Sequence, residues 1–294
     1  MNIPEKIILN PNATHSRRAI EFFRRSGINF IETKDESELE TVLSDMPMTE
    51  DSSRIIICGG DGTINVFLNE FMKIDRESRK NVNLGILPCG RANDLVRATS
   101  TPLNIAQAYS HLKERDGKPV DLLKVNDRYF ITGGGIGLAA RVIETLNDSP
   151  LNKRFLNRVA KDLVYYAFTL KNLIQGYKGV RVSGFDKSPY LVVSVQNQPF
   201  IGKRFNLAPE AVNDDGLCEI CFVPGSESNL RNIQMVRKII KGAHLQEEGV
   251  LERRVERYRL ATEDECYFMG DGELLCKGRE FNIEVMGGEV NLIY

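Results

Sequence analysis

Three glycines and a carboxylate stand together where a short apolar run, Arg54 to Cys58, gives way to Gly59-Gly60-Asp61-Gly62-Thr63. Glycines let a ligand approach the bare backbone, and the N–H groups at the start of a following helix favour an anion such as phosphate. The Asp61 carboxylate repels phosphate unless a cation or a hydroxyl donor lies between them. The stretch predicts a metal-bridged nucleotide or an acceptor hydroxyl at Asp61, and a turn without a ligand is the alternative.

A second polar loop follows the next apolar run, Asn83 to Leu87. It begins with Pro88 and Gly90 and places an acid, Asp94, just inside an expected helix. Loops at the carboxyl ends of neighbouring parallel strands form a ligand crevice in open α/β sheets. The two loops together therefore favour a binding site over a plain turn.

Phosphoryl transfer is the chemistry that fits these residues. It requires in-line positioning, neutralisation of phosphate charge and removal of a proton from the attacking hydroxyl. A carboxylate near that hydroxyl can accept the proton. The candidates are Asp61, Asp94 and Glu273, the last in the turn Gly270-Asp271-Gly272-Glu273, which by composition alone is a hairpin tip.

These motifs resemble the catalytic domain of the diacylglycerol kinase family, and above all the bacterial soluble lipid kinases, with sphingosine and ceramide kinases as relatives. NAD kinases and phosphofructokinases share only the first motif. The resemblance spans nearly the whole chain. Its residues are Asn10-Pro11, Gly59 to Thr63, Asn69-Glu70, Pro88-x-Gly90-x-x-Asn93-Asp94, Lys161 to Tyr166, Asp214 to Leu217 and Asp271-Gly272-Glu273.

The resemblance implies ATP and Mg²⁺ as cofactors and a lipid as acceptor. It places Asp61 and Asp94 in the nucleotide and magnesium network, gives Asp121 a supporting role, and leaves Glu273 or Asp61 as the base. With Asp271, Glu273 would lie at the mouth of a cleft between two domains. The implied nucleotide-binding residues are Asn10, Gly59, Gly60, Gly62, Thr63, Asn65, Glu70, Gly90, Arg91 and Asn93.

A structural magnesium site is also implied, at the Asp215 carboxylate and at backbone carbonyls that include Leu217. Without the resemblance, Asn213 to Leu217 would be assigned as a type I turn.

Two loops depart from the family pattern. Arg91 stands where relatives usually have threonine, and Asn10 to Ala13 lacks their small Ser-Gly pair. The Arg91 guanidinium either clamps a phosphate or fills part of the pocket. The pose of the nucleotide or the preferred acceptor is therefore expected to differ from relatives.

Composition indicates an ordinary soluble protein, with 294 residues, 42% hydrophobic and 27% charged. The formal net charge of -1 gives no bulk attraction to nucleic acid or to membranes, so a transient peripheral membrane contact would need local basic patches. The first candidate patch comprises Lys153, Arg154, Arg158 and Lys161, and the second comprises Arg253, Arg254, Arg257 and Arg259. For each patch the alternative is a charged face that is simply exposed to water. No run approaches the roughly 20 apolar residues of a membrane span, and no secretory segment precedes the first expected strand. The prediction is a cytoplasmic protein with peripheral membrane contact, no nucleic-acid partner, and a homodimer as an open option.

Six cysteines are predicted to be buried free thiols. Cys218 and Cys221 have the spacing of a metal or redox pair, but they lie in a strand-like run where an offset of three puts them on opposite faces.

Helical and strand patterns alternate through the first third of the chain, which predicts an α/β domain with a mainly parallel sheet similar to that of NAD kinases and phosphofructokinases. From Pro119 onward, short strands interrupted by one long helix, about Leu151 to Gly176, predict a β-rich antiparallel sandwich. The expected domains are 1–121, with 279–294 returning to it, and 122–278.

The favoured function is an ATP-dependent lipid kinase of phospholipid metabolism, which phosphorylates diacylglycerol or a related lipid. The β-rich domain would supply an apolar slot, although its alternating residues would look the same in an ordinary core. The alternatives are a kinase for a soluble hydroxyl compound such as NAD, and a catalytically silent nucleotide-binding regulator.

Overall fold

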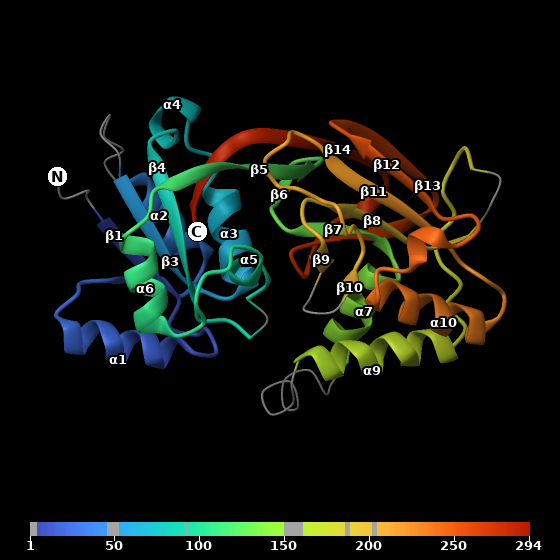
Figure 1. The fold of residues 1–294 in the computed structure, drawn as a ribbon, viewed down its shortest axis with the longest axis horizontal. Coiled ribbons are helices and arrows are strands. Elements are labelled where there is room, and N and C mark those ends of the chain that lie inside the picture. Colours follow the sequence, from blue (N-terminus) through green and yellow to red (C-terminus); the bar gives the residue numbers. More distant parts are fainter. Residues whose placement is uncertain (1–4, 46–52, 92, 150–160, 186–188, 202–204) are drawn as a thin grey trace. The chain divides into compact units, whose positions relative to one another are not determined.

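A computed structural model describes residues 5–45, 53–91, 93–149, 161–185, 189–201 and 205–294 (Figure 1). The chain divides into two compact units. Unit 1 comprises Met1–Leu122 and Met286–Tyr294, and unit 2 comprises Leu123–Val285. No helix in the described ranges is both long and apolar enough to cross a bilayer.

The sheet of unit 1 is parallel. Its strands are β1 (Glu5–Leu9), β2 (Ile31–Glu32), β3 (Ser53–Gly59), β4 (Val82–Pro88) and the last residues of β14 (Glu273–Ile293), in the order β14-β4-β3-β1-β2. Ile56 pairs with Ile7 on one side and Gly85 on the other, and Leu292 pairs with Leu84. β-branched and apolar residues fill both sides of these strands, as a sheet covered on both faces requires.

Helices cover both faces of this sheet. On one face α1 (Ser16–Ser26) and α6 (Ile105–Lys113) pack through Phe23 and Leu112 against Ile56 and Leu87 (Figure 1). α3 (Asp61–Phe71), which contacts α2 (Glu36–Ser44), buries Phe67 and Phe71. Alternation along β3 directs Ile55 and Ile57 to the opposite face from Ile56. The short helices α4 (Arg76–Arg79) and α5 (Asp94–Ala98) flank β4.

Unit 2 is built on antiparallel strands in the order β12-β11-β8-β7-β13-β14. These are β12 (Leu251–Val255), β11 (Cys218–Pro224), β8 (Tyr190–Gln196), β7 (Gly133–Gly137), β13 (Arg257–Gly270) and the first part of β14. β5 (Gly117–Val125) begins in unit 1, continues into unit 2 after Leu122, and pairs with β14 and with β6 (Arg128–Phe130). β9 (Phe200–Ile201) pairs with β10 (Phe205–Asn206). A 3₁₀ turn, η2, spans His244–Gln246.

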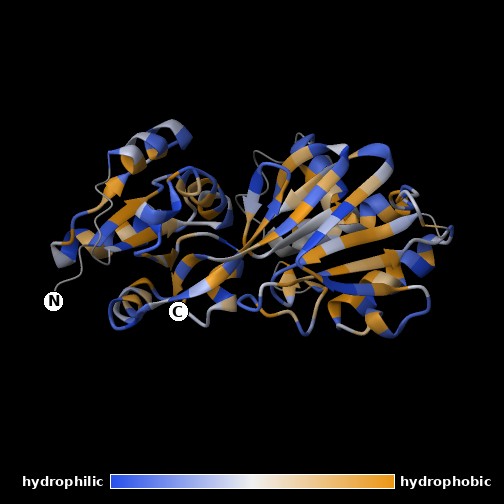
Figure 2. Cartoon of the chain, turned by 90° about the horizontal axis from the view of Figure 1, so that it is seen from above, coloured by the Kyte–Doolittle hydropathy of each residue, from blue (hydrophilic) through white to orange (hydrophobic). Residues whose placement is uncertain are grey.

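Besides a small cluster of Ala140, Ile143 and Met269, two larger cores stabilise unit 2. One lies between strands and contains Phe130, Val193, Phe222, Phe268 and Phe281. The other lies where α7 (Leu138–Asn147), α9 (Lys161–Ile174) and α10 (Asn229–Ile240) cover the sheet. Figure 2 shows hydrophobic residues on strands of both units and hydrophilic residues alternating with them along the helices and the outer strands. The expected fold class, an α/β domain followed by a β-rich domain, is therefore confirmed.

The expectation of one helix among the later strands was wrong, because α7 and α10 are present beside α9. Their sequence signals were an apolar face through Leu138, Val142 and Leu146, and the Ser228 side chain that caps α10. The first part of the long expected helix, residues 151–160, lies outside the described residues.

Candidate active site

Three parallel strands end at one edge of the unit 1 sheet. Leu9 pairs with Cys58, and Gly59 pairs with Pro88, so the loops after β1, β3 and β4 begin at the same level. The Asn10 N–H donates to the Cys58 carbonyl at 3.0 Å, and the Cys89 N–H donates to the Gly59 carbonyl at 3.2 Å. This register places the two glycine loops and the Asn10 loop side by side.

The two glycine loops touch through bare backbone. A Cβ added to Gly90 would lie 2.4 Å from the Gly60 Cα, and one added to Gly60 would lie 3.0 Å from the Gly90 Cα. Any side chain at Gly90 would therefore push the loops apart. The absence of side chains at both glycines is what allows this close approach of the two backbones.

Asp61 connects the loops. It is the first residue of α3, and its carboxylate accepts the N–H groups of Asn93 at 3.1 Å and Asp94 at 2.8 Å. Asn93, in a left-handed conformation with φ 53°, accepts the Gly90 N–H through Oδ1 at 2.9 Å and donates to the Gly90 carbonyl at 3.0 Å. The resemblance implies that Asp61 and Asp94 belong to one nucleotide and magnesium network, and in the structure the backbone N–H of Asp94 donates to the Asp61 carboxylate.

The first turns of α3 extend this network. The Asn10 amide donates to the Thr63 hydroxyl at 3.0 Å, and a Cβ on Gly59 would lie 2.4 Å from the Thr63 Cβ. Asn65 is buried one turn further along the helix, where its carbonyl oxygen accepts the Asn69 amide at 2.9 Å. Gly62 lies in the first turn, between Asp61 and Thr63.

Glu70 lies away from the loops. It is nine residues beyond Asp61 on the same helix, or roughly 13 Å at 1.5 Å per residue. Its carboxylate is buried and binds the Lys73 ammonium at 2.7 Å. The structure does not bring Glu70 to the Asp61 carboxylate.

Arg91 follows Gly90 and reaches the loop after β1. Its Nε donates to the Thr14 hydroxyl at 3.2 Å. The pKa of the neighbouring His15 is lowered, first by burial and then by the positive charges of Arg18 and Arg91. Sequence reasoning missed Thr14, His15 and Arg18, because a polar segment after a strand is typical of any turn.

Asp121 is buried on β5 within unit 1, and its Oδ1 accepts the Gly288 N–H at 3.0 Å. This bond holds the segment in which the chain returns to unit 1, where Gly288 has φ 61°.

In unit 2, Asp271 is an acceptor for the loop between β6 and β7. Its carboxylate accepts the Thr132 hydroxyl at 2.6 Å, the Thr132 N–H at 2.8 Å and the Ile131 N–H at 3.1 Å. The Asn197 amide donates to the Ile131 carbonyl at 3.0 Å on the other side of this loop. Glu273, two residues on, is exposed at the start of β14. Asp271 therefore fixes the turn that presents Glu273.

The Asp215 turn is tied to the sheet of unit 2 by an arginine. Asp215 Oδ1 accepts the Leu217 N–H at 2.9 Å, and Oδ2 forms an ion pair with Arg254, whose Nε lies 3.2 Å from Glu219 Oε1. The Arg254 guanidinium thus lies beside the carboxylate that the resemblance assigns to magnesium. In the part of the chain that the structure describes, no group of three or more His, Cys, Asp or Glu side chains is arranged to hold a metal. The structural magnesium site at Asp215 and Leu217 stays a prediction.

The second basic patch is largely neutralised. Arg257 binds Glu284 at 2.7 Å, Arg259 binds Glu280 at 2.8 Å, and Arg254 binds acids as above. Arg253 stacks over the rings of Phe185 and Tyr258. The other patch falls outside the described residues at Lys153, Arg154 and Arg158, as does the side chain of Lys161.

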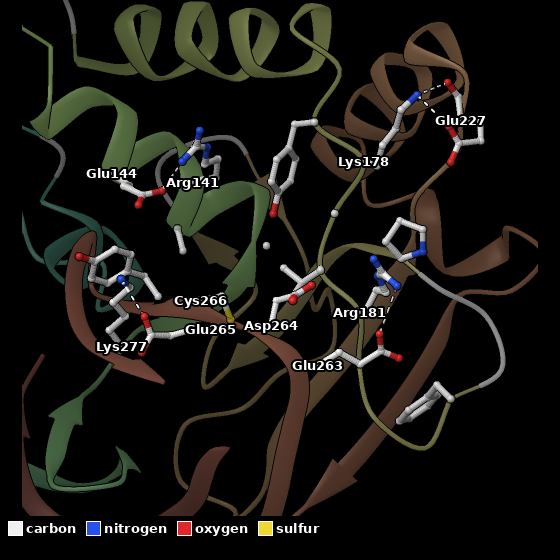
Figure 3. A pocket seen from close by; sticks show the side chains of 18 residues that line it. Arg141, Glu144, Lys178, Arg181, Glu227, Glu263, Asp264, Glu265, Cys266 and Lys277 are labelled. Carbon is white, nitrogen blue, oxygen red and sulfur yellow. Dashed lines mark hydrogen bonds and ion pairs between the residues drawn. The ribbon is translucent and has the colours of Figure 1, made fainter. Parts of the chain in front are cut away.

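A hollow of 1020 Å³ opens on unit 2 between α7, residues 177–181 and the bulged part of β13. Its four basic side chains are each paired with an acid, as Figure 3 shows: Arg141 with Glu144, Lys178 with Glu227, Arg181 with Glu263 and Lys277 with Glu265. Because these charges cancel, the hollow offers no net positive charge to a phosphate.

All six thiols are free, as predicted, but Cys266 and Cys276 are only partly buried. Cys218 and Cys221 lie in different cores on opposite faces of β11, as the offset of three predicted. Burial raises the pKa of each to about 12.

Comparison with known proteins matches one family domain to the N-terminal part of the chain and another to the C-terminal part. Residues 6–125 match the diacylglycerol kinase catalytic domain, and residues 135–294 match the YegS C-terminal NAD kinase beta sandwich-like domain. A "Probable lipid kinase YegS-like" from Serratia proteamaculans is 30% identical over 236 residues, covering 79% of this chain and 73% of its own. A diacylglycerol kinase from Bacillus subtilis is 26% identical over 229 residues, covering 74% and 70%. A diacylglycerol kinase structure from Bacillus anthracis, 22% identical, covers 99% of this chain and 96% of its own with a TM-score of 0.69, which shows a shared fold.

Proposed function

The chain belongs to the diacylglycerol kinase family, and from this premise we propose that it transfers the γ-phosphate of ATP to a hydroxyl of diacylglycerol or a related lipid. The observation that best supports the proposal is the joined pair of glycine loops, with Asp61 bonded to the backbone of Asn93 and Asp94. Names of relatives agree with a lipid acceptor, since they include lipid kinases and diacylglycerol kinases.

In this proposal the nucleotide phosphates bind the backbone where Gly60 meets Gly90, beside Thr63 and Asn10. Asp61 and Asp94 would hold Mg²⁺, which neutralises phosphate charge when bound. Asp121 has a structural role in the same unit, where its carboxylate accepts the Gly288 N–H. The donor set fits a hard cation because it consists of carboxylate oxygens. Asp61 is already oriented by two N–H donors, so its position requires no reorganisation when the ligand arrives.

The acceptor hydroxyl needs a base, and we assign this role to Glu273 or Asp61. Glu273 is exposed on a turn held by buried Asp271, which suits a group that must meet an incoming substrate. Asp61 is held more firmly and carries its charge beside the phosphate loops. A lipid acceptor also implies transient contact with a lipid surface.

The test measures transfer of labelled phosphate from ATP with Mg²⁺ to micellar diacylglycerol, phosphatidylglycerol, ceramide and sphingosine, and to NAD. We expect one lipid to be labelled, and the variant that removes the base, Asp61→Asn or Glu273→Gln, to lower the rate about 100-fold or more, as loss of a positioned acid–base group does. The matched control is Glu263→Gln, which removes an exposed carboxylate of unit 2 far along β13 from the Asp271 turn.

Labelling of NAD alone would show a kinase for a soluble substrate. Binding of ATP without transfer to any acceptor would indicate a nucleotide-binding regulator. Either result contradicts the lipid kinase proposal.

A further inference from the structure

Positive charge gathers where the loop after β1 meets the loop after β4. The His15 N–H donates to the Cys89 carbonyl at 2.9 Å, which holds the first loop beside Gly90 and Arg91. Arg91 crosses to the first loop through its 3.2 Å bond to the Thr14 hydroxyl. Two segments more than seventy residues apart in sequence therefore form one junction.

Three basic side chains, His15, Arg18 and Arg91, lie near one another at this junction. Both Arg18 and Arg91 lie close enough to His15 to disfavour its protonated form, in addition to the effect of burial. Among the described residues no carboxylate forms an ion pair with Arg18. Like charges brought together repel, and an anion between them removes that repulsion.

The junction borders the place where phosphate is expected. Arg91 directly follows Gly90, whose backbone touches Gly60. Its Nε bond to Thr14 orients the planar guanidinium, whose fork matches two phosphate oxygens at once. A threonine at this position would offer one hydroxyl and no charge.

We infer that Arg91, supported by Thr14, His15 and Arg18, clamps the phosphate chain of the nucleotide. This inference rests on the proposed function, because it takes the two glycine loops as the nucleotide site. It assigns to Arg91 the first of the two roles that the sequence left open, a phosphate clamp and not a pocket filler.

Calorimetric titration of the full chain with ATP and with adenosine tests the clamp. We expect Arg91→Thr to weaken ATP binding about tenfold or more, as loss of a charge-assisted hydrogen bond does, and to leave adenosine binding unchanged. Arg91→Lys keeps the charge without the fork and is expected to fall in between. Arg17→Thr is the matched control, because it removes an exposed arginine next to Arg18 in the sequence.

A second measurement follows the His15 imidazole by NMR, with His15→Gln to assign its signal. An anion between His15 and the two arginines offsets their positive field, so ATP is expected to raise the pKa of His15 in the native chain. In Arg91→Thr the free protein is expected to start from a higher His15 pKa, and ATP to change it less.

Equal ATP affinity in the native chain and Arg91→Thr, while the native chain still binds ATP, would overturn the clamp and leave the kinase proposal intact. Equal losses for ATP and adenosine would assign Arg91 to the shape of the pocket and also overturn the clamp. A native chain that binds no ATP would overturn both proposals.

Discussion

At the scale of single residues, two aspartates act as acceptors for backbone N–H groups. Asp61 holds the residues that start α5, and Asp271 holds the loop between β6 and β7. A carboxylate in such a place arranges the backbone around it as well as presenting its charge. Removal of either side chain is therefore expected to have two effects. It disturbs the backbone that the carboxylate holds, and it removes a negative charge.

Asp271→Ala is expected to lower the free energy of unfolding by about 3 kcal/mol or more. The change leaves the buried N–H groups of Ile131 and Thr132 and the Thr132 hydroxyl without their acceptor. Urea unfolding measures the loss. Asp264→Ala, at an exposed acid on the same strand that precedes Asp271, is the control and is expected to change stability by less than about 0.5 kcal/mol. Equal effects of the two variants would show that the Asp271 bonds add no stability.

At the scale of elements, sequence patterns identify the strands that are marked by a run of apolar side chains. The β3 and β4 strands and the loops after them follow from apolar runs that end in Gly and Pro. β7 could not be found this way, because it is Gly133-Gly134-Gly135-Ile136-Gly137. Neighbouring backbone leaves no room for side chains at these glycines. A Cβ on Gly135, for example, would lie 2.1 Å from the Val193 carbonyl oxygen. A strand selected for the absence of side chains has no side-chain pattern to detect.

In the candidate site, residues that are close in sequence could be predicted, whereas contacts between distant segments could not. Asp61 and Gly90 were predicted from local spacing, because each lies in a short loop after an apolar run, and Asn93 was predicted from the family resemblance. Arg254 was found only as part of a basic run. Its partners Asp215 and Glu219 are more than thirty residues earlier, and only strand register brings them together. The Arg91 contact with Thr14 was missed for the same reason.

Glu219, on β11, is expected to make stability depend on pH. Burial raises its pKa from 4.5 to about 7, the charge of Arg254 opposes this, and the charge of Asp215 adds to it. The folded state therefore binds a proton more tightly than the unfolded state between these values, so the contribution of Glu219 to stability falls as pH rises from 4.5 through 7.

Glu219→Gln removes this titration. Its free energy of unfolding, relative to the native chain, is expected to rise between pH 5 and pH 8 by at most about 3 kcal/mol. Urea unfolding at the two pH values measures the change, and the exposed Glu263→Gln is the control. A difference that stays constant with pH would show that Glu219 titrates at an ordinary value.

At the scale of the whole molecule, burial is expected to protect the thiols. Cys58, Cys89, Cys218 and Cys221 are buried, and burial raises the pKa of the half-buried Cys266 to about 11. Because the thiolate is the reactive form, native cysteines should react with Ellman's reagent at pH 8 on the order of 100-fold more slowly than in guanidinium. All six should react once the chain is unfolded. A native thiol that reacts within seconds would contradict this expectation.

Unit 1 is assembled from two separate parts of the chain, and this has a consequence for synthesis. The ribosome completes every residue of unit 2 before it makes residues 286–294. Until then β4 has no Leu292 beside Leu84, and Asp121 has no Gly288 N–H to accept. An open strand edge can pair with other chains. We therefore expect the β-rich unit to fold first during translation, while the unit with the two glycine loops remains the more exposed to misassembly until its last strand arrives.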